Sequence, residues 1–343
     1  MKLKSLHIAN YKIFKGFEID FCIDNSPADI IVIAGVNGTG KTTLLKEVIK
    51  GPWDGFQNAQ ARIVITNQEN QDGLAFSVNQ FSMFSDDSHM IYLPASVVKT
   101  DNLAASIIKY VDKQIYEENK TSAEAYVEVQ RMIDLIFKDF DLNTRFFGMN
   151  RDKDLIFTNL QNERFGINGL SAGEKQILGK VFPLFINEMR DKVILMDEPE
   201  ESLHPSWQIN LVPVLRRCAK ENNCQFILAT HSPQIISSVK AEELRLLVRD
   251  ENSNIRSITC SEGPYGWTIE RVLSEIQRVN YFRVPEVEVK LEKLRKMIGR
   301  NEYDTDSFKV LWTEMEALLG YPDKDLVLMR MEILRRRKKN EEN

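Results

Sequence analysis

The chain has 343 residues, which leaves room for one large domain with an appendage or for two domains. Hydrophobic residues make up 43% of it and charged residues 28%, and no apolar run approaches the roughly 20 residues that span a bilayer, so we expect a soluble globular protein without membrane association. The net charge of −5 argues against indiscriminate coating of nucleic acid, and four cysteines without a C-x-x-C pair indicate a reducing, cytoplasmic location rather than a zinc site or a disulfide framework.

The chain opens with two predicted strands. Residues 2–9 and 16–23 alternate between apolar and polar side chains, which is typical of half-buried strands, and residues 10–15 join them. The connection contains Lys12, which fits either a solvated turn residue or a ligand of a bound group.

The most specific motif follows at residues 35–42, which fit the phosphate-loop pattern G-x-x-x-x-G-K-[ST] at every fixed position. Residues 30–34 form a β-branched apolar run that predicts a buried strand, and residues 43–49 predict the following helix. Glycines let the backbone N–H groups of such a loop turn toward a triphosphate, and the helix N-terminus adds its positive dipole end. Lys41 can reach the β- and γ-phosphates, and the Thr42 hydroxyl can hold Mg²⁺. The predicted nucleotide-binding residues are Asn37, Gly38, Thr39, Gly40, Lys41, Thr42 and Thr43.

Further strands are predicted at residues 61–66, 75–78 and 89–94. Residues from about 100 to 142 carry apolar side chains at helical spacing, which predicts an insertion of two helices. Two helices of about 15–20 residues extend only roughly 25–30 Å, so this insertion is too short to bridge distant DNA segments.

A hairpin is predicted at residues 145–158, and residues 170–176 follow with the sequence Leu-Ser-Ala-Gly-Glu-Lys-Gln. Ser171 is placed to cap a helix, and Glu174 lies three residues later, as in a capping box. The pattern fits a helix that is merely well capped. It also fits an open helix N-terminus whose Ser171 and Gly173 meet the γ-phosphate of a nucleotide held by a second subunit.

Two later strands are predicted to end in polar groups. Residues 193–196 form an apolar run that ends at Asp197 and Glu198, and neighbouring side chains on a strand point to opposite faces. Asp197 is predicted to hold Mg²⁺, and Glu198 to orient and activate the attacking water in phosphoryl transfer. Residues 225–229 form the next apolar run, and His231 lies just beyond its end.

The C-terminal part is predicted to be helical. After a hairpin at residues 244–258, helices are expected at about 268–279, 286–299, 305–319 and 324–338. We therefore divide the chain into a head at residues 1–265 and a helical module for protein contact at residues 266–343. The apolar helical faces expected to bind a partner include Leu311, Met315, Leu318 and Leu319. The basic run at residues 335–339 fits a solvated helix end, and a contact with nucleic acid stays open.

The order of these motifs resembles the ATP-binding-cassette ATPases over roughly residues 1–250. The resemblance implies an α/β fold, with a P-loop NTPase head, a short helical insertion and a C-terminal helical module. It implies that Lys41, Glu198 and His231 are catalytic, with His231 contacting the γ-phosphate, and that Lys12 lies near the nucleotide. Such ATPases also carry a metal-contacting glutamine before the helical lobe, and none of the candidates can be singled out: Gln57, Gln60, Gln68, Gln71 and Gln80.

The sequence most resembles the stand-alone ATPases of bacterial anti-phage systems, of the Septu type and the retron-linked type. Leu203-His204-Pro205 departs from the Ser-Ala-Leu-Asp of cassette transporters and is similar to the soluble defence and repair branch. The resemblance implies ATP and Mg²⁺ as cofactors, and a head-to-head homodimer or higher homo-oligomer. It also implies a separately encoded effector, an HNH-type nuclease or a toxin, bound through the C-terminal module.

Two alternatives to this function stay open, a DNA-repair ATPase that binds DNA ends and a regulatory module that closes on ATP with little turnover. Glu262-Gly263 and Asp304-Thr305-Asp306 superficially resemble the acids of nucleases fused to such ATPases. Because Asp304 does not follow a buried strand, no nuclease is expected within the chain.

Overall fold

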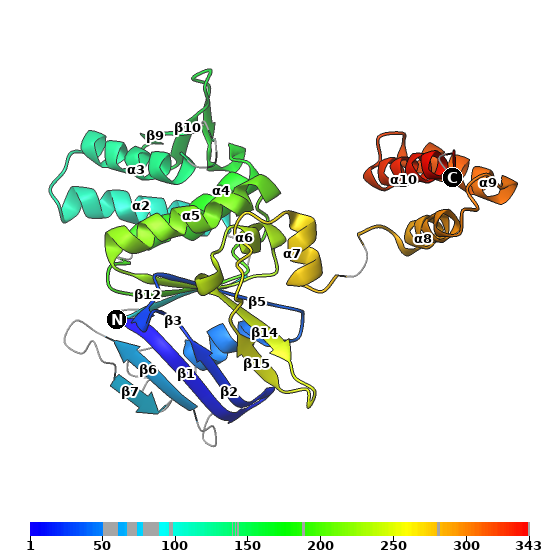
Figure 1. The fold of residues 1–343 in the computed structure, drawn as a ribbon. Helices are drawn as coiled ribbons and strands as arrows, with labels where there is room; N and C mark the ends of the chain where they lie inside the picture. The colour runs from blue at the N-terminus through cyan, green and yellow to red at the C-terminus, as the bar shows by residue number, and fades with distance from the viewer. Residues whose placement is uncertain are drawn as a thin grey trace. The chain divides into compact units, whose positions relative to one another are not determined.

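The computed structural model describes residues 1–50, 61–66, 74–77, 89–95, 99–138, 140, 142, 144–186, 189–279 and 282–341 (Figure 1). It divides into two compact units, Met1–Gln277 and Arg278–Asn343. All five candidate metal-contacting glutamines, Gln57, Gln60, Gln68, Gln71 and Gln80, lie outside the described residues.

The first unit is built on a six-stranded sheet in the order β15-β14-β5-β13-β12-β8, in which only β15 is antiparallel to its neighbour. Its strands are β5 (Ile30–Gly35), β8 (Met90–Leu93), β12 (Val193–Asp197), β13 (Gln225–Ala229), β14 (Leu244–Arg249) and β15 (Ile255–Ile258). Every residue of β5, β12 and β13 is buried, as expected for parallel strands that are covered on both faces. The predicted α/β class is confirmed.

An antiparallel sheet in the order β2-β1-β6-β7 lies on one side of the central sheet (Figure 1). Its strands are β1 (Lys2–Tyr11), β2 (Phe14–Asp20), β6 (Ala61–Thr66) and β7 (Leu74–Ser77), and a short β3 (Cys22–Ile23) pairs with β4 (Ser26–Pro27). The predicted opening hairpin is therefore present, with a longer first strand, a second strand that begins at Phe14 and ends at Asp20, and a tighter turn than expected. The segment after the phosphate loop, η1 (Thr43–Ile49), is wound as a π-helix and shares one hydrophobic core with both sheets.

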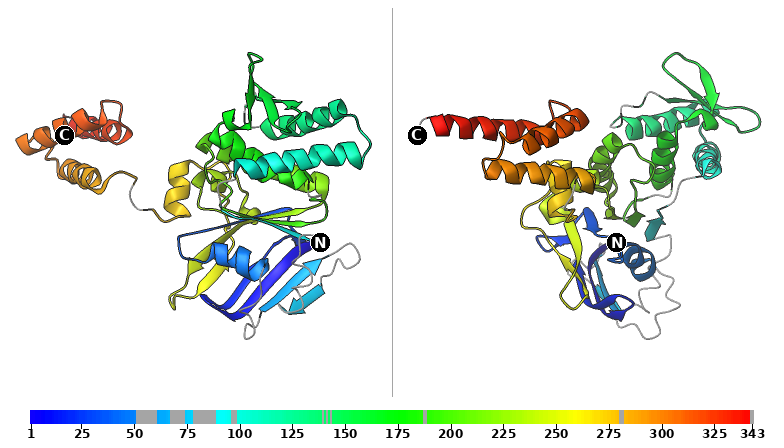
Figure 2. Two further views of the ribbon diagram at one scale, coloured as in Figure 1. Left: turned by 180° about the vertical axis from the view of Figure 1, so that it is seen from behind. Right: turned by 90° about the vertical axis from the view of Figure 1, so that its right-hand side faces the viewer.

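Helices cover the opposite face of the central sheet, as two further views also show (Figure 2). They are α2 (Thr100–Tyr116), α3 (Ser122–Phe137), α4 (Ala172–Ile186), α5 (Pro205–Asn222), α6 (Pro233–Ser237) and α7 (Ile269–Glu275), with short 3₁₀ turns at Ile167–Gly169 and Ala241–Glu243. The two helices predicted in the insertion are α2 and α3. A small sheet of β9 (Arg145–Met149), β10 (Leu155–Thr158) and β11 (Arg164–Gly166) follows them, and β9 packs against α3.

The second unit consists of α8 (Pro285–Gly299), α9 (Asp306–Leu319) and α10 (Lys324–Glu341), packed around their own apolar core. Met315 is buried in that core, and Leu311 and Leu319 pack against it, whereas Leu318 is exposed. The prediction that all four residues face a partner is therefore wrong for Met315. Helical spacing identifies an apolar stripe, and it does not tell whether the stripe faces a core or a partner.

The first unit extends to Gln277 rather than ending near residue 265. Helix α7 belongs to it because Val272 and Ile276 are buried in the same core as the helices over the central sheet. Among the described helices, none combines the length and the apolar composition that a membrane span requires.

Gln225, the first residue of β13, links the central six-stranded sheet to the four-stranded antiparallel sheet. It is fully buried, its Oε1 accepts a hydrogen bond from Leu3 N at 2.7 Å, and its Nε2 donates to Leu3 O and Ala28 O, both at 3.0 Å. The side chain thereby joins the main chain at the start of β1, where Leu3 also pairs with Ile65 of β6, to the main chain just before β5.

We predict that Gln225→Met lowers the free energy of unfolding by about 3 kcal/mol, because three buried hydrogen bonds worth roughly 1 kcal/mol each are lost. Urea denaturation measures the change. Gln161→Met, at an exposed turn, is the matched control and should change stability by less than about 0.5 kcal/mol. A loss below about 1 kcal/mol for Gln225→Met would show that the two sheets are held together by other contacts.

Candidate nucleotide site

Three neighbouring parallel strands deliver the predicted site residues to one edge of the central sheet. Strand β13 lies between β5 and β12, and Asp197 pairs in register with Ala229. The phosphate loop follows β5, Asp197 ends β12, and His231 comes two residues after β13 ends. Because the carboxyl ends of parallel strands meet at the same edge, the three segments converge there.

The phosphate loop adopts a backbone that needs glycine at three positions. Gly35, Gly38 and Gly40 have φ angles of +152°, +77° and +85°. A Cβ atom at Gly40 would lie 2.5 Å from Ile13 Cδ1, because the tip of the β1–β2 hairpin packs onto the loop. Arg249 of β14 supports the other side, since its Nη2 donates to Gly38 O at 2.8 Å.

Lys41 is buried at the centre of the site. Its Nζ donates hydrogen bonds to Gly35 O at 2.8 Å and Val36 O at 3.3 Å, and lies 3.5 Å from His231 Nδ1. Burial lowers the pKa of Lys41 to about 8, and three nearby carboxylates oppose that fall: those of Glu198, Asp197 and Glu200. The lysine is thus a cation among acids, held in position to receive an additional anion.

Thr42 and Asp197 place two oxygen ligands side by side. Thr42 Oγ1 donates to Asp197 Oδ1 at 3.2 Å, and Tyr92 OH of β8 donates to Asp197 Oδ2 at 3.4 Å. Burial raises the pKa of Asp197 because the charged form loses its contact with water, and the hydrogen bonds from Thr42 and Tyr92 oppose that rise.

These groups fit Mg²⁺, which prefers oxygen ligands and takes one or two protein groups together with phosphates and water. Among the described residues, no group of three or more His, Cys, Asp or Glu side chains could hold a metal without other ligands. The protein therefore offers part of a metal shell, and the phosphates of a nucleotide would supply another part.

Glu198 and His231 face each other beside Lys41. His231 Nε2 lies 3.7 Å from Glu198 Oε1, and the Glu198 side chain is 42% exposed, so solvent reaches it. Glu198 has a φ angle of +43°, a strained conformation that often marks functional sites when a residue other than glycine adopts it. Burial and the neighbouring Lys41 charge lower the pKa of His231, so its ring is neutral at pH 7.

The signature segment forms the predicted capping box. Glu174 N donates to Ser171 Oγ at 3.2 Å, and Ser171 N donates to Glu174 Oε2 at 2.8 Å. A Cβ atom at Gly173 would lie 2.1 Å from the Trp207 ring, so only glycine fits between α4 and α5. Ser171 is exposed, and no hydrogen bond among the described residues joins it to the phosphate loop of its own chain.

Lys12 is held at the hairpin turn with a φ angle of +49°. Its ammonium pairs with the carboxylate of Glu47 in η1, which raises the pKa of Lys12, and lies 5.5 Å from the Tyr11 ring. The structure thus places Lys12 against the helix that follows the loop, and its contact with phosphate stays a prediction.

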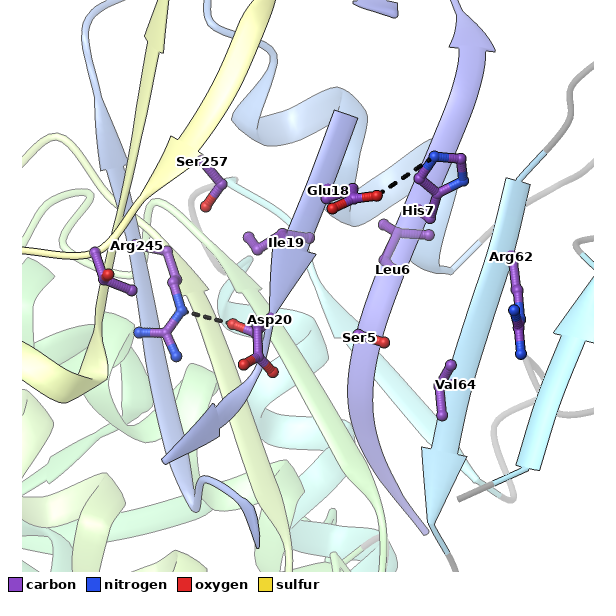
Figure 3. Close-up of a pocket in the computed structure, with 11 residues that line it drawn as sticks. Ser5, Leu6, His7, Glu18, Ile19, Asp20, Arg62, Val64, Arg245 and Ser257 are labelled. Carbon is purple, nitrogen blue, oxygen red and sulfur yellow. Dashed lines mark hydrogen bonds and ion pairs between the residues drawn. The ribbon is translucent and has the colours of Figure 1, made fainter. Parts of the chain in front are cut away.

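A pocket of about 700 Å³ lies on the outer face of the antiparallel sheet, and none of the predicted site residues lines it (Figure 3). Several of its charged groups already have partners within the protein. Arg245 Nε donates to Asp20 O, its Nη2 donates to Cys22 O at 2.8 Å, and His7 lies 3.7 Å from Glu18. We therefore assign the nucleotide to the edge of the central sheet and not to this pocket.

Four contacts of the site could not be read from local sequence. Tyr92 and Arg249 reach it from neighbouring strands, and Gln277 donates to His231 O from 46 residues away. Glu200, two residues after Glu198, accepts hydrogen bonds from the His231 segment. Of these four residues, the sequence indicates only Glu200, because it lies in the acidic run after Pro199.

Comparison with known families agrees with this geometry. A family model described as an AAA ATPase domain matches residues 56–236, more than half of the chain. The chain belongs to this AAA ATPase domain family. A second model, described as an AAA domain, matches residues 5–51, which include the opening hairpin and the phosphate loop.

The AAA ATPase domain is similar to curated proteins of two kinds. The Retron Ec83 probable ATPase of Escherichia coli is 27% identical over 198 residues, which cover 53% of this chain and 34% of the relative. The Septu protein PtuA of Bacillus mycoides is 21% identical over 321 residues, which cover 79% of this chain and 44% of the relative. The chain spans less than half the length of these relatives.

Among solved structures, an SMC head bound to the C-terminal winged-helix domain of ScpA has the same fold. It superposes with a TM-score of 0.51 at 13% identity, covering 76% of this chain and 98% of that one. At this identity the likeness shows the fold alone.

We predict that ATP affinity falls about tenfold between pH 7 and pH 9. The pKa of Lys41 is lowered to about 8 by burial, so the fraction that carries the charge falls from about 0.9 to about 0.1 over this interval, and bound phosphate favours the charged form. Titration calorimetry at both pH values measures the change.

Lys41→Arg is the control, because a guanidinium stays charged throughout this range and the pH dependence should disappear. Lys41→Ala should bind ATP at least about 100-fold more weakly than the wild type at pH 7. An affinity of the wild type that is unchanged at pH 9 would argue against Lys41 as the cation that holds the phosphates.

Proposed function

We propose that this chain binds ATP with Mg²⁺ and hydrolyses it in a head-to-head homodimer, and that this cycle regulates a separately encoded effector in anti-phage defence. The observation that carries the ATPase part is the convergence of Lys41, Thr42, Asp197, Glu198 and His231 at one sheet edge. These groups are a cation, an oxygen pair, an exposed carboxylate and a neutral imidazole, which together match the needs of phosphoryl transfer.

Each group has a distinct task in the proposed reaction. Lys41 would bind the β- and γ-phosphates, and the oxygens of Thr42 and Asp197 would hold Mg²⁺, whose chemistry there is to stabilise negative charge on phosphate oxygens. Glu198 is the group that solvent can reach, so it orients the attacking water and accepts its proton. Neutral His231 lies between Lys41 and Glu198 and donates a hydrogen bond toward the γ-phosphate.

The dimer part of the proposal rests on the signature helix. Ser171 is exposed at the capped N-terminus of α4 and its recorded hydrogen bonds stay within the first turn of that helix. In a head-to-head dimer this helix end would meet the γ-phosphate bound by the other copy, as the positive end of a helix dipole favours an anion.

The defence role and the effector are inferred from relatives whose names refer to retron and Septu systems. The second unit of this chain carries a groove of about 350 Å³ between α9 and α10, with Phe308, Trp312 and Leu334 among its apolar walls. Lys309, Arg330 and Arg337 line it as well, and each is paired with a carboxylate, that of Asp306, Glu316 or Asp304. We propose that the effector inserts an apolar segment into this groove, because these cations already have partners and the apolar side chains of the lining are the part that a partner can still bury.

We predict that Glu198→Gln retains ATP binding and lowers the hydrolysis rate about 10²–10⁴-fold, because the amide keeps the shape and cannot accept the proton of the water. The ATP-bound dimer should then accumulate, and size-exclusion chromatography with and without ATP measures it. Glu262→Gln, an exposed acid, is the control and should hydrolyse ATP normally.

Near-normal turnover of Glu198→Gln would move the base to another residue. Loss of ATP binding would make Glu198 a structural or metal-holding residue. A wild-type protein that binds ATP and scarcely hydrolyses it would favour the alternative of a regulatory binding module.

We predict that Leu334→Asp abolishes co-purification of the effector encoded beside this chain and leaves the ATPase rate unchanged, because the new charge lies in the apolar groove. Val289→Asp on α8 is the matched control, since Val289 is 68% exposed and lies outside the groove. Capture of the effector by Leu334→Asp at the wild-type level would place the contact elsewhere.

A further inference from the structure

The main chain of His231 is held from both sides by side chains distant in sequence. Its N–H donates to Glu200 Oε1 at 2.9 Å, and its carbonyl oxygen accepts a hydrogen bond from Gln277 Nε2 at 2.7 Å. One contact comes from the turn after β12, and the other from the end of α7. Neither residue touches the imidazole ring in these contacts.

Glu200 fixes the whole segment around the histidine. The same Oε1 atom also accepts from Thr230 Oγ1 at 2.6 Å and from Ser232 N at 3.0 Å. Burial raises the pKa of Glu200, and the hydrogen bonds from Thr230, His231 and Ser232 oppose that rise. These three donors share one oxygen, so its position determines where residues 230–232 can lie, and the loss of this acceptor would leave all three donors without it.

Glu200 is poorly suited to act as a base itself, although it lies close to Glu198 in sequence. Its Oε1 is occupied by the three donors, and its Oε2 is buried. Glu198, in contrast, is 42% exposed and faces the His231 ring. The two acids therefore have separate tasks: Glu198 faces the solvent, and Glu200 holds the main chain of residues 230–232.

The His231 imidazole can move little before it loses its contact with Lys41 or with Glu198. Nδ1 lies 3.5 Å from Lys41 Nζ, and Nε2 lies 3.7 Å from Glu198 Oε1. A main-chain shift of about 1 Å at residue 231 would carry the ring out of reach of one or the other, and misplacements of this size can cost about 100-fold in rate.

Gln277 is anchored by a packed helix. Val272 of α7 and Ile276, the residue after the helix, are buried in the core over the central sheet, and Gln277 follows Ile276 directly. Gln277 is also the last residue of the first compact unit, so the bond to His231 is made where the chain leaves that unit.

We infer that Glu200 and Gln277 are positioning residues that set the imidazole of His231 for hydrolysis by fixing its main chain from two sides. The inference rests on the proposed ATPase function and deepens it, because it assigns the task of placing the histidine to two residues outside the reacting groups.

The test compares Gln277→Met and Glu200→Ala with matched controls. Glu275→Met introduces the same side chain at an exposed position of α7, and Glu201→Ala removes the neighbouring acid, which accepts no recorded hydrogen bond from residues 230–232. The ATP dissociation constant, kcat at saturating ATP and the melting temperature are measured for each variant.

Gln277→Met should lower kcat about tenfold, the effect of one hydrogen bond, and Glu200→Ala should lower it at least as much, while ATP affinity changes less than about threefold. Glu200→Gln should recover much of the rate, because its amide oxygen can accept the same three donors. Both controls should retain the wild-type kcat. In a His231→Ala background, neither Gln277→Met nor Glu200→Ala should lower kcat further, because residues that act through the histidine are not additive with its loss.

Wild-type kcat in Gln277→Met, or an effect that adds fully to that of His231→Ala, would overturn the inference. If Glu200→Ala fails to fold, as its melting curve would show, Gln277→Met decides alone. A second measurement separates this inference from the proposed function: the ring ¹H–¹³C chemical shifts of His231 should move in Gln277→Met and not in Glu275→Met. If the wild type hydrolyses no ATP, the proposed function fails, and unchanged His231 shifts would overturn the inference as well.

Discussion

The nucleotide site depends on one buried cation, the Lys41 ammonium, which lies among three carboxylates. Lys41 lies at the edge of three parallel strands with Asp197, Glu198 and Glu200 around it, and burial lowers its pKa while their charges raise it. A lysine in this position is held ready for phosphate, and an acid-rich edge that also offers a hydroxyl and a carboxylate oxygen is ready for a divalent cation. The cation that suits phosphate and the oxygen groups that suit a metal thus lie side by side at this edge.

Packing on both faces of the central sheet holds this edge in place. The strands that deliver the loop, the acids and the histidine are buried on both faces, because one core fills the space toward the helices and another the space toward the antiparallel sheet. The β1–β2 hairpin packs onto Gly40, and Arg249 supports Gly38 from β14. The phosphate loop is therefore braced by two sheets, and this explains why an antiparallel sheet with no reacting group belongs to the site.

Much of the site could be predicted from sequence because its parts are local patterns. A glycine loop after an apolar run identified Lys41 and Thr42, and apolar runs that end in polar groups identified Asp197 and His231. Tyr92, Arg249 and Gln277 could not be found this way, since each reaches the site through tertiary packing and none lies in a motif. For the same reason the sequence misplaced the end of the first unit and the exposure of Met315, because spacing shows that a helix has an apolar face and not what covers it.

The position of Gln277 connects the two proposals made for this chain. Its side chain holds the carbonyl of His231, and the peptide bond that follows it leads into the second unit, which carries the groove proposed for the effector. Coupling between two sites requires an element whose arrangement both sites influence. In the proposed function, a γ-phosphate would act on the His231 ring, and the residue after which the chain enters the second unit holds the His231 carbonyl. The hydrogen bond between Gln277 and His231 is therefore an element on which both the nucleotide and the second unit could act.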